Sequence, residues 1–439
     1  MRYSRWCICG TERQLRIDSL AVSNFRAFQY SEFSFDPKLN LIIGANGSGK
    51  SSLLHALGAA LVDAVAQLSG NYMATSIDSV EVRVEALVIN NQVRVEKRFP
   101  VRIDATGRVF EQGLSWSVVR SRESESPGPA LGIVRPIRDR METIDVSRPF
   151  TLPIVAIYHA QRNAKAEDVS LGSAAKEKVS RAGGYDSWLD ALTDGSRLES
   201  WVIGKTLERL QRLSEGAEAI SDDDELAVVN KAVSGCIPGA KGLRYDLRLR
   251  SLLLECEAGS PIPFFNLSDG QQGMISLVAD IARRVCILNP HLGAQVLEET
   301  DGIIAVDELD IHLHPSWQGR ILSILRSVFP RIQFFATSHS PQMVGGLHPS
   351  QVLILNNGKV ERPQFTYGLD SSRILEDIMD SDSREPEIRE IIGQLFLSVE
   401  NGELAVAKKQ LAKLREVAPG LPDYPHLDAL IRRKETIGR

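Results

Sequence analysis

The amino-acid sequence predicts an α/β protein built on a mixed sheet, with a β-rich insertion, a helical lobe and a helical C-terminal region. Three patterns support this fold class. The apolar strand Leu39–Ile43 runs into a glycine-rich turn and then into a helix. Residues 80–119 alternate apolar and polar side chains, as half-buried strands do. Residues 273–355 alternate helical and strand patterns, and a charged helical pattern begins at Ser371.

The elements between these patterns follow in order. Residues 15–35 are strand-like, and the helix after the glycine-rich turn places Leu53, Leu57 and Leu61 on one face. Residues 121–140 are rich in Ser, Glu, Pro, Gly and Arg, which predicts a mobile loop. We expect a buried strand at residues 152–158, helices over most of residues 164–232, and strands within residues 243–257.

The composition indicates the kind of surface and the cellular compartment to expect. The 439 residues carry a formal net charge of -5, which argues against a uniformly basic surface but leaves room for a local basic groove. Five scattered cysteines suit a reducing compartment, and Cys7 and Cys9 lack a second Cys/His pair at zinc-finger spacing. No uncharged apolar run approaches the roughly 18 residues that span a bilayer, and the first residues lack the apolar core of a signal peptide. We therefore expect a cytoplasmic protein with no membrane partner.

A complete P-loop, Gly44-Ala45-Asn46-Gly47-Ser48-Gly49-Lys50-Ser51, lies between the strand and the helix that such a loop requires. Its glycines let the backbone wrap a phosphate, and the helix N-terminus adds positive potential. Lys50 is expected to reach the β- and γ-phosphates of a nucleotide, and Ser51 to coordinate Mg²⁺. The expected nucleotide contacts are Asn46, Gly47, Ser48, Gly49, Lys50, Ser51 and Ser52.

Two later strands end in groups that suit phosphate chemistry. Residues 302–308 form an apolar strand that ends in the adjacent carboxylates Asp307 and Glu308. Side chains alternate along a strand, so one carboxylate can hold Mg²⁺ while the other polarises the attacking water. The strand at residues 332–337 leads to His339, which can sense a γ-phosphate through a hydrogen bond. Solvated strand-end acids and a structural histidine are the alternatives for these residues.

A fourth motif, Leu267-Ser268-Asp269-Gly270-Gln271, opens a long helical pattern. Ser268 is a natural N-cap, and Gly270 leaves the start of the helix open to an anion. Taken alone, the same residues also suit a simple turn and cap. In the segment that follows Asp307 and Glu308, His312 and His314 crowd with carboxylates, so a zinc or iron site is a further alternative there.

These four motifs, in this order, resemble the head of the ABC ATPases, in its RecF/SMC/OLD branch. The resemblance identifies residues 44–51 as Walker A, residues 267–271 as the signature, residues 303–307 as Walker B with Asp307 on Mg²⁺ and Glu308 catalytic, and His339 as the switch histidine. It makes Lys50, Glu308 and His339 the catalytic residues of ATP hydrolysis. It implies that Gln161 adds to the Mg²⁺ site, that Arg26 approaches the nucleotide, and that Asp310 of the D-loop faces an opposite subunit. Asp269 departs from the usual first glycine of the signature.

The resemblance also implies a head-to-tail homodimer. In the resembled architecture the signature cannot reach its own P-loop. Ser268, Gly270 and Gln271 are therefore expected to contact ATP in trans, with ATP and Mg²⁺ as the cofactors. The implied fold is an ABC ATPase head, with a P-loop core, a β-rich insertion and a helical lobe. We divide it into residues 15–163 with the P-loop and insertion, 164–266 with the helical lobe, 267–362 with the remaining motifs, and a helical partner-docking region at 363–439.

The sequence that flanks the motifs resembles that of the PtuA family of Septu and retron-associated ATPases. The similar segments are residues 267–290, 312–318, 329–334 and 367–375, and the resemblance covers about Leu15 to Ile431. In that family the ATPase dimerises, often assembles further, and binds an HNH-type nuclease, PtuB. Retron versions also involve a reverse transcriptase and its DNA–RNA product. The resemblance implies a regulatory ATPase of an anti-phage complex whose C-terminal helices dock such partners.

Two other functions remain open from the sequence. One is a DNA-repair clamp that resembles RecF and binds duplex DNA directly. The other is a scaffold that uses ATP only as a structural component, although the intact Glu308 and His339 argue against it. The C-terminal helices could also simply complete the fold.

Overall fold

The computed structural model describes residues 15–71, 77–89, 92–110, 112–143, 150–160, 180–191, 195–216, 224–356, 358–379, 385–421 and 423–437. The chain divides into two compact units, residues 1–369 and residues 370–439. The predicted α/β class, with a mixed sheet and a helical C-terminus, is confirmed.

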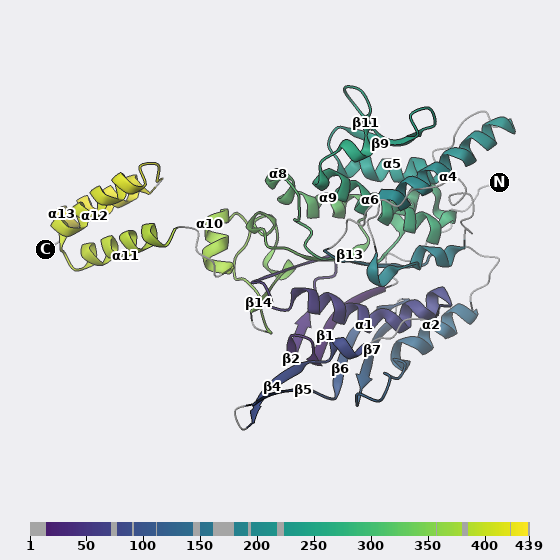
Figure 1. The fold of residues 1–439 in the computed structure, drawn as a ribbon, viewed down its shortest axis with the longest axis horizontal. Helices are drawn as coiled ribbons and strands as arrows, with labels where there is room; N and C mark the ends of the chain where they lie inside the picture. The colour runs from purple at the N-terminus through teal and green to yellow at the C-terminus, as the bar shows by residue number, and fades with distance from the viewer. Residues whose placement is uncertain are drawn as a thin grey trace, which may run out of the picture. The chain divides into compact units, whose positions relative to one another are not determined.

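A six-stranded sheet organises the first unit (Figure 1), with the strand order β15-β14-β3-β13-β12-β8. Its strands are β3 (Leu39–Gly44), β8 (Ile154–Tyr158), β12 (Gly302–Val306), β13 (Ile332–Thr337), β14 (Val352–Asn356) and β15 (Lys359–Glu361). All neighbouring strands are parallel except β14 and β15. Every residue of β3, β8, β12 and β13 is buried, which explains why the sequence shows these strands as continuous apolar runs.

A second, antiparallel sheet lies on the other side of the long helix α1 (Lys50–Ser69). Its strand order is β2-β1-β6-β7, and its strands are β1 (Leu15–Phe25), β2 (Phe28–Ser34), β6 (Val101–Val109) and β7 (Gln112–Arg120). Helix α1 contacts strands of both sheets, so it is apolar around most of its circumference (Figure 1). Its length and hydropathy would suffice to cross a membrane, but 72% of the apolar window is buried inside the protein, as in a core helix.

A buried side-chain amide joins the six-stranded sheet to the four-stranded sheet. The side chain of Gln333, on β13, is fully buried, and its Nε2 donates to the backbone oxygens of Ile17 (2.8 Å) and Asp36 (3.0 Å). The backbone N–H of Ile17 donates in turn to Gln333 Oε1 at 3.0 Å. The six-stranded sheet is thus fixed to strand β1 by a satisfied polar group inside an apolar core.

One predicted element is wrong in part. Residues 121–130 are irregular, as predicted for a loop, but Leu131–Thr143 form helix α2. Ile133, Val134 and Ile137 are buried, and α2 contacts α1 and β7. Pro136 inside the helix and the scarcity of apolar residues conceal this short buried face from the sequence pattern.

A mainly helical region follows β8 in the chain. Its main helices are α4 (Gly195–Ser214), α5 (Glu225–Cys236) and α6 (Asp269–Leu288), and its sheet has the order β11-β10-β9 with β9 (Ala240–Asp246), β10 (Ser251–Cys256) and β11 (Ile262–Pro263). The short helices α7 (Val296–Glu299), α8 (Pro315–Gln318) and α9 (Ile321–Val328) flank β12 in the sequence. Asp224 caps α5 by accepting from the backbone N–H groups of Leu226 and Ala227.

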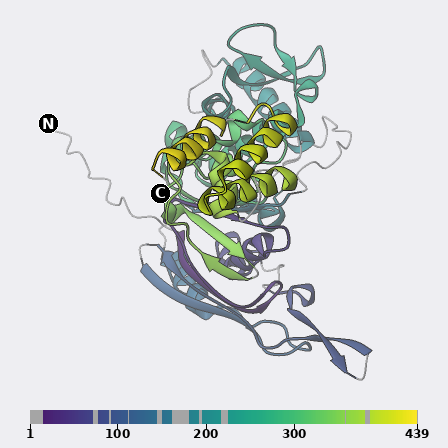
Figure 2. The same ribbon diagram turned by 90° about the vertical axis from the view of Figure 1, so that its left-hand side faces the viewer.

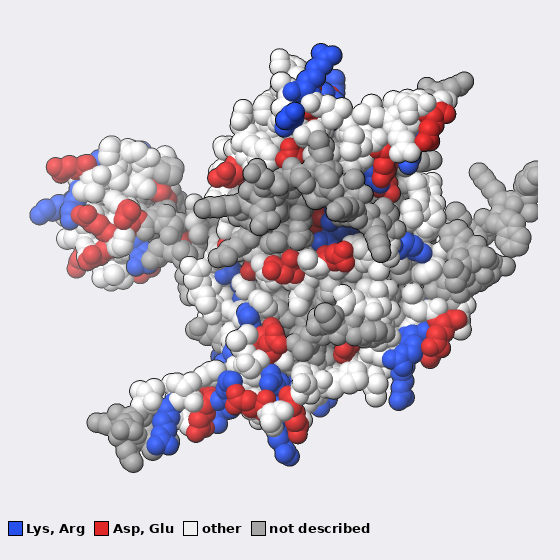
Figure 3. Space-filling view, turned by 45° about the vertical axis from the view of Figure 1, so that its right-hand side comes forward, with Lys and Arg blue, Asp and Glu red and all other residues white. Residues whose placement is uncertain are grey.

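The predicted β-rich insertion contains a hairpin of its own, β4 (Val84–Ile89) and β5 (Gln92–Lys97), which Figure 2 shows extending away from the four-stranded sheet. The charge on the surface is mixed. On the face drawn in Figure 3, the described basic and acidic side chains are interspersed. This agrees with the modest net charge of -5.

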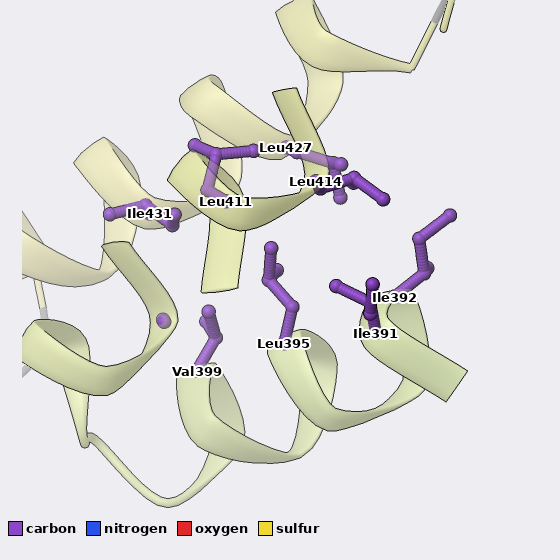
Figure 4. Close-up of a cluster of buried hydrophobic side chains, with 9 residues drawn as sticks. Ile391, Ile392, Leu395, Val399, Leu411, Leu414, Leu427 and Ile431 are labelled. Carbon is purple, nitrogen blue, oxygen red and sulfur yellow. The ribbon is translucent and has the colours of Figure 1, made fainter. Parts of the chain in front are cut away.

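The second unit is helical, with α10 (Ser371–Arg373), α11 (Pro386–Glu400), α12 (Leu404–Val417) and α13 (Tyr424–Ile437). Its last three helices share a hydrophobic core (Figure 4), formed by Ile391, Ile392, Leu395, Val399, Ala407, Leu411, Leu414, Leu427 and Ile431. All the residues of this core belong to the second unit.

Candidate active site

The glycine-rich loop joins β3 to α1, where the sequence predicts it. Gly44 and Gly49 cannot be replaced by larger residues without displacement. A Cβ on Gly44 would lie 2.3 Å from the backbone oxygen of Leu355, and a Cβ on Gly49 would lie 2.9 Å from the ring of Phe28. Gly49 also has a φ of +109°, which side chains rarely adopt. The loop is therefore a tight backbone turn at the N-terminus of a long helix, which is a favourable place for an anion.

Lys50 begins this helix and is only 7% exposed. Its Nζ donates to the backbone oxygens of Gly44 (2.9 Å) and Ala45 (3.1 Å). Burial lowers the pKa of Lys50, and the neighbouring carboxylates of Asp307, Glu308 and Asp310 oppose this shift. The lysine is thus held across the loop within the field of three acids.

The two predicted carboxylates follow β12, and three neighbouring groups hold their backbone. The N–H of Asp307 donates to the oxygen of Tyr158 at 2.8 Å, and that of Leu309 to the oxygen of Thr337 at 3.0 Å. Between them, the N–H of Glu308 donates to the Thr337 hydroxyl at 2.7 Å. That hydroxyl also donates to Asp307 Oδ1. Glu308 has a φ of +48°, a left-handed conformation that costs a non-glycine residue about 1–2 kcal/mol.

His339 follows β13 and is linked to the same loop. Its backbone N–H donates to Asp310 Oδ2 at 3.3 Å, while Asp310 Oδ1 is buried without a hydrogen-bond partner among the described residues. Gln318 Nε2 donates to the oxygen of Asp310 (3.3 Å), and Gln318 Oε1 accepts from Ser340 at 2.8 Å. Asp310, which the resemblance turns toward an opposite subunit, thus also braces His339 in its own chain.

The strand order β3-β13-β12 places the carboxyl ends of these three strands side by side. The structure therefore brings Lys50, Asp307, Glu308 and His339 to one edge of the sheet. The remaining P-loop residues differ in exposure, since Ser48 is buried while Asn46, Gly47 and Ser51 are exposed and Ser52 is half-buried. The Ser48 hydroxyl oxygen has no hydrogen-bond partner among the described residues.

The signature turn lies at the start of α6. Ser268 Oγ accepts from the backbone N–H of Gln271 (3.4 Å), and Gln271 Oε1 accepts from the backbone N–H of Ser268 (3.2 Å), so the two form a capping box. Gly270 packs against the D-loop, because a Cβ there would lie 2.1 Å from the backbone oxygen of His312. Among the described residues, the hydrogen bonds of Ser268 and Gln271 stay within this turn and none reaches the P-loop.

The alternative metal ligands have other contacts. His314 Nδ1 accepts from the backbone N–H of Ser316 and caps α8. In the described part of the chain, no group of three or more His, Cys, Asp and Glu side chains is arranged to hold a metal. Cys7, Cys9 and the predicted Mg²⁺ ligand Gln161 lie outside the described residues.

Arg26 lies in a polar group that the sequence does not reveal. Its backbone N–H donates to the oxygen of Glu81 at 2.8 Å, and its Nε lies 4.0 Å from Glu81 Oε1. His55, one turn after Ser51 on α1, lies 3.4 Å from the same carboxylate oxygen and stacks on His159 with ring centroids 4.9 Å apart. Arg26 and the first turns of α1 are thus linked through Glu81.

A buried network ties the signature helix to β8. The Tyr158 hydroxyl donates to Asp280 Oδ2 at 2.8 Å, and Arg284 Nε donates to the same oxygen at 2.7 Å. Burial would raise the pKa of Asp280, but the charges of Arg284 and Arg283 outweigh it and hold that pKa well below its usual range. The sequence contains no local signal for this network, although the Asp-Ile-Ala-Arg-Arg run places both arginines within one helical turn of Asp280.

Two family models match the part of the chain that carries the site residues. A family model described as an "AAA domain" matches residues 19–221, and a second, described as "AAA domain, putative AbiEii toxin, Type IV TA system", matches residues 160–345. Together they cover the P-loop, the signature, both carboxylates and His339. A solved SMC head domain from Thermotoga maritima aligns with 79% of this chain and 98% of its own, with 13% identity and a TM-score of 0.40.

Two curated relatives extend over most of the chain, and a third covers part of it. The Retron Ec83 probable ATPase of Escherichia coli is 26% identical over 85% of this chain and 78% of its own length. The Retron Vc95 probable ATPase of Vibrio cholerae is 24% identical over 78% of this chain and 74% of its own. Septu protein PtuA of Bacillus mycoides is 28% identical over 39% of this chain and 24% of its own. The chain is therefore a relative of the AAA-family ATPases, and the retron ATPases and Septu PtuA are its homologues.

Proposed function

We propose that this chain hydrolyses ATP to ADP and phosphate and acts as the regulatory ATPase of a bacterial anti-phage defence complex, where it controls a partner HNH-type nuclease. The observation that carries the ATPase proposal is the meeting of Lys50, Asp307, Glu308 and His339 at the carboxyl ends of three adjacent strands. The names of the retron and Septu homologues support the defence setting.

The loop supplies the phosphate-binding groups. The backbone N–H groups of the turn and of the start of α1 suit the oxygens of a triphosphate. The proposed contacts are Asn46, Gly47, Ser48, Gly49 and Ser52. Lys50 now donates to two carbonyls of its own loop, and a phosphate oxygen is a stronger acceptor for an ammonium than a carbonyl. The Ser48 hydroxyl is buried and has no hydrogen-bond partner in the described part of the chain, which fits the same interpretation. Arg26 is proposed to contact the nucleotide from the Glu81 side.

The donor set also fits Mg²⁺. Three carboxylates act on a single buried lysine, so the site has an excess of negative charge, and magnesium prefers oxygen ligands. Asp307 and the Ser51 hydroxyl are the proposed ligands, with Gln161 as a further ligand. When bound, the ion would neutralise charge on the phosphate oxygens.

Glu308 has the role of general base in this proposal. It accepts a proton from water as the water oxygen attacks the γ-phosphorus, while the bond from that phosphorus to the bridging oxygen breaks and ADP leaves. His339 donates a hydrogen bond to the γ-phosphate, and Lys50 offsets the charge on the β- and γ-phosphates.

Two variants test the chemistry. Glu308→Gln should bind ATP as well as the wild type but lose turnover by about 100-fold or more, because a neutral amide cannot accept the proton. Lys50→Ala should weaken binding itself. Phosphate release and equilibrium binding of a fluorescent ATP analogue separate the two effects. Full turnover by Glu308→Gln would remove Glu308 from its proposed role.

We also propose that the nucleotide is shared between two copies of the chain. Ser268, Gly270 and Gln271 would contact the triphosphate that is held by the P-loop of the other copy. The described side-chain bonds of Ser268 and Gln271 remain within the signature turn, and none of them reaches the P-loop of the same chain, which supports a role in trans. The resulting head-to-tail homodimer can assemble further.

The separate C-terminal unit is the proposed docking surface for partners. It has its own hydrophobic core, and α11 exposes Leu397 at 59% and Phe396 at 37% beside the buried residues of the same helix. The proposed partners are a PtuB-like nuclease and, in a retron setting, a reverse transcriptase with its DNA–RNA product. A cytoplasmic location belongs to this proposal.

A pull-down of the tagged chain from its native host, with and without ATP, tests the partner assignment. A co-purifying nuclease whose retention changes with ATP would support regulatory control. Recovery of duplex DNA instead, with binding that weakens steeply with salt, would favour a RecF-like clamp and contradict the assignment.

A further inference from the structure

Strand β13 ends in a buried threonine between the two strand ends that carry the proposed catalytic groups. Thr337 has no exposed surface, and its strand lies between β3, which leads into the P-loop, and β12, which leads into Asp307 and Glu308. Most of β13 is apolar, so a hydroxyl at its last position is a departure from the pattern.

The hydroxyl makes one bond to each catalytic carboxylate residue. It donates its single proton to Asp307 Oδ1 and accepts the backbone N–H of Glu308 at 2.7 Å. A hydroxyl can donate and accept at the same time, whereas a methyl group can do neither. Replacing Thr337 by valine would therefore remove both bonds while nearly preserving the shape of the side chain.

The bond from the Glu308 N–H to the Thr337 hydroxyl helps to hold the backbone of the turn after β12. Three successive N–H groups hold the turn after β12, at Asp307, Glu308 and Leu309. The outer two donate to backbone oxygens, and the middle one donates to the Thr337 side chain. Glu308 is also the residue with a left-handed φ of +48°. The strained residue is thus held by the one bond of the three that a substitution can remove.

We propose that Thr337 is a positioning residue for ATP hydrolysis: its hydroxyl fixes the backbone of Glu308 in the left-handed conformation and sets the orientation of the Asp307 carboxylate. This inference rests on the proposed ATPase function. Thr337 lies 29 positions from Glu308 and 30 positions from Asp307 in the sequence, so no local motif links the three residues.

Three variants test the inference. Thr337→Ser keeps the hydroxyl and should retain most of the activity. Thr337→Val should lower kcat by about 100-fold with little change in the KM for ATP, because a misplaced catalytic group slows the chemical step more than it weakens binding. Thr300→Val is the matched control. Thr300 is also fully buried and accepts a hydrogen bond from Asn289, but it precedes β12 at the opposite end from Asp307. This control should keep the wild-type kcat, even if it unfolds more easily.

A binding measurement adds a readout that does not depend on turnover. The Mg²⁺ concentration for half-maximal binding of a fluorescent ATP analogue should rise about 10-fold in Thr337→Val and stay at the wild-type value in Thr337→Ser and Thr300→Val, since groups that orient a metal ligand affect metal affinity. A wild type that binds nucleotide without hydrolysing it would refute the proposed ATPase, and the Mg²⁺ titration would still decide whether Thr337 orients Asp307. An unchanged kcat together with an unchanged Mg²⁺ midpoint in Thr337→Val would overturn the inference.

Discussion

At the scale of single residues, Gly270 shapes the site because it has no side chain. Gly270 allows the start of the signature helix to lie against the backbone of His312, which itself has a left-handed φ of +60°. The signature turn and the D-loop are therefore in direct contact within one chain. A side chain at position 270 would press on a backbone oxygen, which cannot move aside as the end of a flexible side chain can.

We expect Gly270→Ala to lower the free energy of unfolding by about 1–3 kcal/mol through overpacking, and to reduce ATP turnover because the signature turn and the D-loop are displaced together. Gly273→Ala is the matched control. It lies in the same helix with nothing within 4 Å of the added Cβ, so it should be neutral or stabilise the helix by up to about 1 kcal/mol. Urea unfolding and phosphate release measure the two effects. Equal behaviour of the two variants would contradict the close contact with His312.

At the scale of secondary-structure elements, the sequence predicts what is local and continuous. Strands β3, β12 and β13 are recognisable because all their residues are buried, and the loop at residues 44–51 is recognisable because its strand and helix are adjacent in the chain. Helix α2 is missed because only three of its residues are described as buried and Pro136 interrupts it. Its burial depends on α1 and β7, which propensity alone cannot anticipate.

In the candidate site, the sequence likewise predicts single residues but not the contacts between distant ones. The motifs predict Lys50, Asp307, Glu308 and His339 as separate groups at strand ends. They do not predict Thr337 as the link between two of them, because that link joins residues 29 positions apart. The Tyr158–Asp280 bond joins residues 122 positions apart and is equally hidden from local patterns. The sheet order brings Thr337 beside Glu308, and the packing of helix α6 against β8 brings Asp280 to Tyr158.

Helix α6 and strand β8 are coupled by this buried ion-pair network, which also includes Arg284. Its side chain is 2% exposed and donates to the backbone oxygens of Gly184 (3.0 Å) and Asp186 (2.8 Å) as well as to Asp280. The backbone oxygen of Tyr158 accepts from Asp307, while its hydroxyl donates to Asp280. One tyrosine thus connects the carboxylate strand end to the signature helix.

Asp280→Asn should therefore lower the free energy of unfolding by about 3–5 kcal/mol, because the charge of Arg284 would remain buried without its partner. Arg244→Gln, which breaks the surface pairs of Arg244 with Asp246 and Glu255, is the control and should leave stability almost unchanged. The folded pKa of Asp280 is lowered, so its stabilising contribution is complete above the unfolded pKa of about 4 and is lost as pH falls below it. In urea unfolding at several pH values, the gap between wild type and Asp280→Asn should narrow below pH 4, and a gap that widened there would contradict the ion pair.

At the scale of the whole molecule, the proposed site requires groups from two copies. The P-loop, both carboxylates and His339 meet within one chain, whereas the described bonds of the signature turn stay within the turn. In a two-fold symmetric dimer each copy would contribute a P-loop to one site and a signature to the other. Sites shared between two copies predict that mixing two inactive variants restores activity, whereas a site within a single chain does not.

We expect Lys50→Ala and Ser268→Arg each to abolish turnover alone, because every dimer of either variant has two defective sites. In a mixture, the heterodimer combines both defects in one site and leaves the other intact. Random exchange at equal amounts should therefore restore about a quarter of the wild-type rate, since half of the dimers are mixed and each has one working site of two. Phosphate release before and after mixing measures this recovery, with each variant mixed with itself as the control. If the signature served the P-loop of its own chain, mixing would restore nothing, because each chain would carry its own defect into its own site.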